Sequence, residues 1–125
     1  MSTLNVSNIT DGTTTVGTSY VVNGSAKAWI NFIGTVSSSA RDSLNVSSTT
    51  DGGTGTYTIT FTSSFGAANY VAASTLNLRS GSATGLYMTD SSSMAAGSIG
   101  MTSDRVGTGV VDHEYNLVMF TGELA

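Results

Sequence analysis

The chain has 125 residues, no cysteine and no proline, with charged residues at only 10% of positions and a formal net charge of −4. This length suits one domain, and the missing cysteines exclude a disulfide framework and a thiolate metal site. The four basic residues are scattered, and neither a bilayer-spanning apolar run nor a signal peptide is visible, so we expect a soluble protein without nucleic-acid binding or membrane insertion.

Serine and threonine make up about a third of the chain, and short alternating apolar runs recur along it. Threonine favours strands, while serine, asparagine, aspartate and glycine favour turns. About eight strands separated by turn signals predict an all-β fold, either an antiparallel β-sandwich or a jelly-roll-like barrel. We expect a short N-terminal arm over residues 1–25, acting as an assembly contact, and a single β domain over residues 26–125.

The first 25 residues predict short extended segments. Leu4, Val6 and Ile9 nearly alternate with polar residues, which favours a first strand. Residues 20–22 (Tyr-Val-Val) predict a second short strand, and Asn23-Gly24 is a favoured hairpin turn. Such a segment lies against a neighbouring subunit or forms the first strand of its own sheet, and the residues leave both possibilities open.

Residues 26–33 predict a strand with two apolar faces. Ile30 and Phe32 fall on one face, and Trp29 and Ile33 fall on the other. Covering by another subunit would account for this, as would the core of a sandwich. We therefore expect Trp29 in a core or an interface, although a lone exposed aromatic ring can also stack on a sugar.

The middle of the chain predicts an antiparallel hairpin. One strand covers residues 42–48, with Leu44 and Val46 on the same face. Glycine-rich residues 51–55 signal a turn. In residues 56–62 apolar side chains alternate with threonines, which is the clearest half-buried strand of the chain. We expect these two strands to pair.

Four further strands are predicted in the C-terminal half. They cover residues 69–78, 86–89, 98–102 and 110–121. Between them, residues 94–96 predict a helical turn that ends at Gly97. The last strand alternates, with His113, Tyr115, Leu117 and Met119 on one face and Glu114, Asn116, Val118 and Phe120 on the other.

No residue pattern points to catalysis or to a bound cofactor. His113 is the only histidine, and along a strand it points away from Asp112 and Glu114, so the three cannot converge on one ion without a bulge. We interpret His113 as a strand residue packed against a neighbouring chain or at a polar tip. The chain lacks a nucleophile elbow, a phosphate or dinucleotide loop and a calcium loop. We expect no enzyme, no metal and no cofactor.

The neighbours Arg41 and Asp42 have two interpretations. They form a solvated turn pair that contributes little to stability, or an ion pair at a subunit seam. Taking the second interpretation with the apolar strand and the single histidine gives a candidate subunit interface. Its residues are Trp29, Phe32, Arg41, Asp42, His113 and Tyr115.

Four short motifs carry a family resemblance. They are AKAWINF at 26–32, RDSLNVSS at 41–48, GTGTYTITF at 53–61 and ANY at 68–70. In order and spacing the stretch from Ala26 to Val71 resembles a module of short tail-fibre-like proteins of bacteriophages, particularly marine ones, and NLVMFTG at 116–122 is similar more loosely. Gly66-Ala67 departs from the family's Pro-Asp, and residues 76–112 diverge, so partner specificity does not carry over.

The resemblance implies a non-enzymatic virion structural protein, placed at the virion surface and assembled as a homotrimer. Because only 25 residues precede the matching stretch, we expect no fibre shaft. We expect instead a compact β knob, seated on the major capsid protein as a decoration or cement protein or seated on tail proteins. The alternative is a tail-fibre tip that binds host surface polysaccharide, with candidate receptor-facing loops at Arg79, Tyr87 and Arg105.

Overall fold

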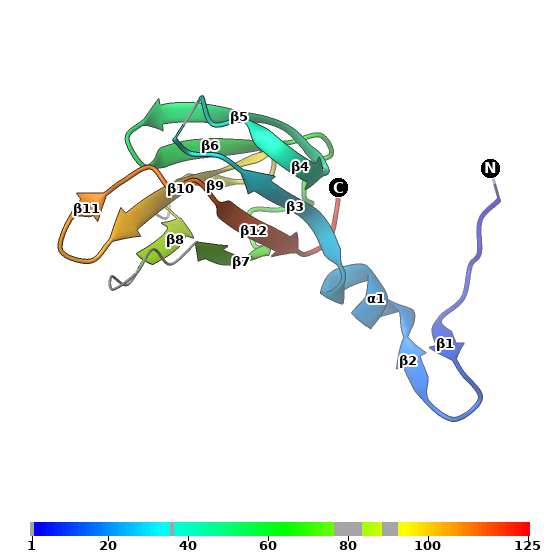
Figure 1. Ribbon diagram of the computed structural model, residues 1–125. Coiled ribbons are helices and arrows are strands. Elements are labelled where there is room, and N and C mark those ends of the chain that lie inside the picture. Colours follow the sequence, from blue (N-terminus) through cyan, green and yellow to red (C-terminus); the bar gives the residue numbers. More distant parts are fainter. Residues whose placement is uncertain (1, 36, 77–83, 89–92) are drawn as a thin grey trace.

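The computed structural model describes residues 2–35, 37–76, 84–88 and 93–125. Within these ranges the chain forms twelve strands and one short helix, arranged as two packed antiparallel sheets with a small hairpin and the helix beyond one end (Figure 1). The prediction of an all-β sandwich is confirmed. The strands of the described part divide into separate sheets, so the barrel alternative is wrong for them.

The first sheet has β3 (Ala26–Phe32) and β12 (Asn116–Thr121) at its centre. Its edges are β4 (Ala40–Leu44), beside β3, and β7 (Val71–Leu76), beside β12. Every pairing in this sheet is antiparallel. The two central strands come from opposite ends of the β domain, so this sheet ties the two ends together.

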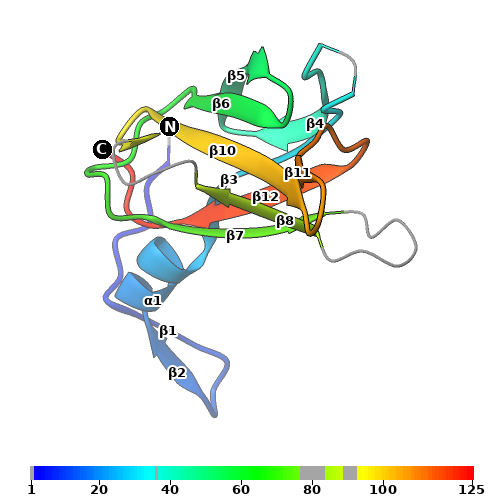
Figure 2. The ribbon, with the colours of Figure 1, turned by 90° about the vertical axis from the view of Figure 1, so that its left-hand side faces the viewer.

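The second sheet is built around β10. It consists of β5 (Val46–Gly53), β6 (Thr56–Phe61), β8 (Thr84–Met88), β9 (Met94–Ala95), β10 (Ser98–Arg105) and β11 (Gly109–Val110). Strands β5 and β6 form an antiparallel hairpin, so the predicted pairing is confirmed from Val46 onward, but Leu44 pairs instead with Trp29 in the first sheet. Figure 2 shows this sheet lying across the first one.

The core fills the space between the two sheets. Ile59 and Phe61 of β6 face Phe120 of β12, and each of these side chains is at most 5% exposed. The Phe61 ring makes edge contacts with the rings of Phe65, Tyr70 and Phe120, at centroid distances of 5.0, 5.5 and 5.1 Å. Each such pair adds about 0.5–1.5 kcal/mol beyond its area burial. The predicted alternation in β3, β6 and β12 is confirmed by these burials.

The predicted strand over residues 42–48 is wrong as one element. Asn45 has a φ of 55°, in the left-handed region, and the chain passes there from β4 of one sheet to β5 of the other. The Asn45 side chain holds this bend, since its Oδ1 accepts from the Ser63 N–H at 2.7 Å and its Nδ2 donates to the Ser63 carbonyl at 3.0 Å. Leu44 therefore points to solvent, while Val46 packs against the core.

The last predicted strand is also divided. Residues 111–115 are irregular and separate β11 from β12, so the alternation expected for His113, Glu114 and Tyr115 does not apply. Met94 and Ala95 pair with β10 as a strand, which makes the predicted helical turn wrong. The ends of two other predicted strands, residues 77–78 and Thr89, lie outside the described residues.

The N-terminal segment consists of β1 (Asn8–Thr10), β2 (Thr15–Gly17) and the helix α1 (Thr18–Gly24). The short strand predicted at residues 20–22 is wrong, because these residues lie in α1, and Gly24 ends the helix instead of forming a hairpin turn. Both ribbon views show this segment beyond the end of the sandwich (Figures 1 and 2). We call residues 2–25 the arm.

Candidate functional site

The outer face of the first sheet, which points away from the core, carries large apolar side chains. Leu44, Trp29, Met119 and Ala73 lie directly opposite one another and form a row across β4, β3, β12 and β7. Residues paired in this way share one face of a sheet. Leu44 is 48% and Met119 is 44% exposed, and Leu117 extends the row along β12. The middle of the outer face is thus an apolar row that nothing in the described chain covers, while Lys27, Asn31 and Asp42 are polar or charged residues on the same face.

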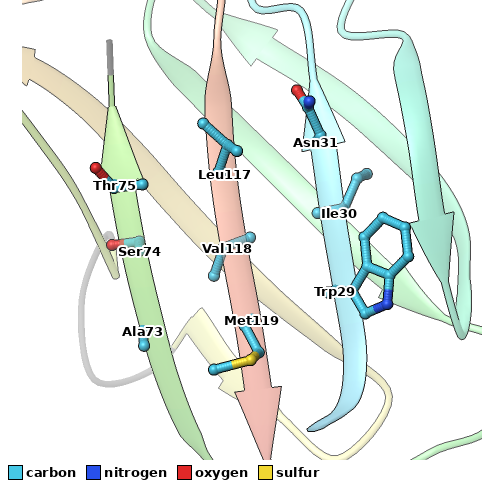
Figure 3. Close-up of a pocket in the computed structure, with 9 residues that line it drawn as sticks. All are labelled: Trp29, Ile30, Asn31, Ala73, Ser74, Thr75, Leu117, Val118 and Met119. Carbon is cyan, nitrogen blue, oxygen red and sulfur yellow. The ribbon is translucent and has the colours of Figure 1, made fainter. Parts of the chain in front are cut away.

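A groove of about 470 Å³ runs over the three strands β3, β12 and β7 (Figure 3). It is lined by Trp29, Ile30, Asn31, Ala73, Ser74, Thr75, Leu117, Val118 and Met119. None of these nine residues is charged. Contiguous exposed apolar surface of this kind marks sites of interaction in soluble proteins. Trp29, expected in a core or an interface, lies outside the core and on this groove.

The arm is the second surface on which no other described part of the chain packs. No residue of α1 is buried, and Tyr20 is 75% exposed, with Val21 and Val22 at 43% and 48%. Ile9 and Val16 of the β1–β2 hairpin are exposed as well. Within the arm only Asp11 is charged. Its carboxylate accepts the N–H groups of Thr14 and Thr13, and these bonds hold the pKa of Asp11 below its usual value. The arm therefore presents apolar side chains and has no core of its own.

Two residues of the predicted interface lie inside the chain. Phe32 is fully buried and packs edge-on against Tyr57, at a centroid distance of 5.0 Å. His113 is 5% exposed, and its Nδ1 lies 2.6 Å from Ser103 Oγ. Burial, and next the positive charge of Arg105, hold the pKa of His113 below its usual value. In the described fold neither side chain has surface left to offer a second chain.

The predicted pair of Arg41 and Asp42 does not form. Arg41 Nη2 instead lies 3.4 Å from Glu114 Oε1, and the guanidinium lies 4.2 Å from the centre of the Tyr115 ring. Asp42 Oδ1 accepts the Ser43 N–H at 2.8 Å. The ion pair is exposed, so it contributes at most about 1 kcal/mol. Sequence reasoning missed Glu114 as the partner, because no local signal links positions so far apart in the chain.

The predicted receptor-facing loops are not brought together in the described residues. Arg79 lies outside them. Tyr87 belongs to a strand, β8, where it pairs with Thr102 of β10. Arg105 is the last residue of β10 and is partly buried. The expectation that Tyr87 and Arg105 sit in loops is therefore wrong.

A partly buried polar cluster around Asp112, at one end of the sandwich, was not predicted. The Asp112 carboxylate accepts the Tyr57 hydroxyl at 2.9 Å and the Gly55 N–H at 2.7 Å. It makes no hydrogen bond to the ring of His113, and Ser103 is fully buried, so these groups do not form an accessible Ser-His-Asp triad. We interpret the cluster as structural, because each bond joins segments far apart in the sequence.

Among the described residues no group of three or more histidine, cysteine, aspartate or glutamate side chains is placed to bind a metal ion. The single described helix is too short and too polar to cross a membrane. Comparison with family models, curated proteins and solved structures found no match to this chain. The apolar outer face and the arm are therefore the features from which a function can be argued.

Proposed function

We propose that this chain is a non-enzymatic structural protein of a bacteriophage virion. It forms a compact oligomeric β knob, a homotrimer, seated on the capsid as a decoration or cement protein or seated on the tail. The observation that carries the proposal is the arm, which forms a hairpin and a helix with apolar side chains but has no buried residue in its helix.

Neither element of the arm is stable by itself. The hairpin has three paired positions, and α1 has seven residues. An isolated two-stranded hairpin is at best marginally stable in water, and so is a helix shorter than about 12 residues. The arm therefore needs a surface outside its own chain on which to fold, as in a protein that works inside an assembly.

The outer face of the first sheet supports the same proposal independently of the arm. Trp29, Leu117 and Met119 expose apolar surface that water does not favour, and burial of such surface contributes about 25 cal/mol per Å². Burial of these neighbouring side chains against a partner would gain this free energy. The virion placement and the trimer rest on the resemblance of residues 26–71 to the tail-fibre-like module.

The experiment that tests the proposal is imaging of intact virions in which this protein carries a label, with a deletion of its gene beside it. A label spread over the head, together with fragile heads in the deletion, supports a decoration protein. A label at the tail, with intact heads and failed adsorption, supports the tail. Virions without any label would overturn the proposal.

A second candidate function is a tail-fibre tip that binds host surface polysaccharide. One observation favours it: the partly exposed Trp29 ring lies on an open groove beside the polar side chains of Asn31 and Thr75. Aromatic rings with neighbouring amides and hydroxyls suit sugars. Binding of purified protein to host polysaccharide, lost in Trp29→Ala and kept in Thr58→Ala on the other sheet, would support this function.

A further inference from the structure

We propose that the groove over β3, β12 and β7 receives the arm of a second copy of this chain. The side chains of Val21 and Val22, which are neighbours on the surface of α1, would lie against Trp29 and Met119. This inference rests on the proposed oligomer and adds to it the two surfaces that meet. It assigns a partner to the only helix of the described chain and to an apolar groove of about 470 Å³.

The two surfaces match in chemistry. The groove has no charged lining residue, and the arm has no charged residue after Asp11. Burial of α1 against the groove lining would therefore bury no charged side chain, and an unpaired buried charge is the costly error at an interface. The charged residues Lys27 and Asp42 lie on the same face of the sheet but do not line the groove. A charged partner segment would gain no ion pair within the groove. A foreign protein would have to supply an uncharged apolar segment, and each copy of this chain already carries one.

The arm of the same chain is directed away from the groove. α1 ends immediately before β3, and the Ser25 N–H and Oγ both donate to the Val21 carbonyl, at 3.2 and 2.6 Å. Lys27 Nζ also reaches that carbonyl, at 3.4 Å, and the Ser25 carbonyl, at 3.2 Å. To cover Leu117 the helix would have to fold back along β3 and break these bonds. The ribbon views show it lying beyond the sandwich end instead (Figures 1 and 2).

An arm that leaves its own body and enters a neighbour's groove makes a head-to-tail contact. Such a contact uses two different surfaces of each copy, and it generates a closed ring when the rotation between copies closes. A head-to-tail ring of more than two copies has at least three, and the proposed trimer is this smallest case. Face-to-face packing of two outer sheet faces would instead give a dimer and leave both arms uncovered.

Chemical cross-linking of the full chain tests the contact, because the protein has no cysteine of its own. One double variant carries Val21→Cys in the arm and Ala73→Cys in the groove; both positions are exposed. The control carries Val21→Cys and Thr58→Cys, with Thr58 exposed on the second sheet. A short bismaleimide should convert most of the first variant into covalent dimers and trimers, and it should leave the control as single chains.

Light scattering on the same samples separates this inference from the proposed function. If the first variant is oligomeric but gives no more cross-linked chains than the control, the arm does not occupy the groove, and the oligomer still stands. A cross-link formed within one chain would mean that the arm covers its own groove. A monomer at all concentrations would overturn both the inference and the proposed oligomer.

A charge in the groove gives a second readout. Met119→Asp places a carboxylate on the exposed outer face, and it should convert the oligomer to a monomer that keeps the strand signal in circular dichroism and loses the small helical contribution of α1. Thr58→Asp on the second sheet should leave the oligomer intact. If Met119→Asp stays oligomeric to the same extent as Thr58→Asp, the groove is not the contact.

Discussion

Trp29 of β3 lies directly opposite Met119 of β12, on the side of the sheet that points away from the core. The neighbours of these two residues in sequence, Ile30 and Phe120, point inward and are at most 1% exposed. At this position the central pair of strands is therefore apolar on both sides, and the described part of the chain covers only the inner side. The uncovered apolar side supports the proposal that the protein functions as part of an assembly. We therefore make the following predictions.

The fluorescence of Trp29 should report assembly, because it is the only tryptophan. In dilute monomer its ring is partly exposed on the groove, and we expect emission at long wavelength. As concentration rises and the groove is covered, the emission maximum should shift to the blue. A titration over protein concentration measures this shift. Emission that does not change while the molar mass rises would place Trp29 outside the contact.

Phe120 and Met119 are neighbours on β12 that face opposite sides, so they form a matched pair. Phe120 is fully buried, and Phe120→Ala should lower the free energy of unfolding by about 3–5 kcal/mol through lost contacts and a cavity. Met119 is 44% exposed, and Met119→Ala should cost less than about 1 kcal/mol in the monomer. Urea unfolding at low protein concentration compares them. Equal losses would contradict the assignment of the two faces.

Asn45 should be replaceable by glycine at lower cost than by alanine. Asn45→Gly keeps the left-handed backbone free of strain but loses the two bonds to Ser63, each worth about 0.5–1.5 kcal/mol. Asn45→Ala loses the same bonds and adds the strain of a Cβ at positive φ, about 1 kcal/mol more. Thermal unfolding of both variants tests this order. An alanine variant as stable as the glycine variant would refute it.

His113 should make the protein less stable in mild acid. Its pKa is lowered in the fold by burial and by Arg105, so the unfolded chain takes up a proton near the usual value of 6.5 and the folded chain does not. The free energy of unfolding should therefore fall as the pH drops below about 6.5, until the lowered pKa is reached. Unfolding between pH 7 and 5 measures the slope.

The control for this pH dependence is His113→Gln, which removes the titrating ring from beside Ser103. The variant should be less stable at pH 7, because a buried contact is altered, but its stability should change less between pH 7 and 5. An equal slope in both proteins would show that another group is responsible.

The sheets and the core were predictable where alternation is clear. The threonine-interleaved β6 and the two-faced β3 were predicted from their patterns, and the burial of Ile59 and Ile30 confirms them. The break at Asn45 was not predicted, because the bonds that hold it come from Ser63 in a distant segment. Val21 and Val22 are β-branched residues that favour strands, so their place in a helix had no local signal.

The candidate site was predictable only in part. Apolar residues on both faces of β3 already suggested a second covered surface around Trp29. The groove, however, also needs Leu117 and Ala73, and these reach Trp29 only through the order β3, β12, β7, which no local pattern encodes. Phe32 and His113 are buried by Tyr57 and Ser103 of the second sheet. No local pattern in the sequence indicates that the two sheets bring these residues together, so the sequence could not distinguish this burial from a subunit interface.

The measurement that tests the central claim most directly is the molar mass of the full chain in solution, by light scattering over a range of concentrations. The account predicts a species of three times the 12.7 kDa of one chain, which dissociates on dilution or in Met119→Asp. A mass of 12.7 kDa at every concentration would contradict it, because the arm and the outer face would then remain uncovered.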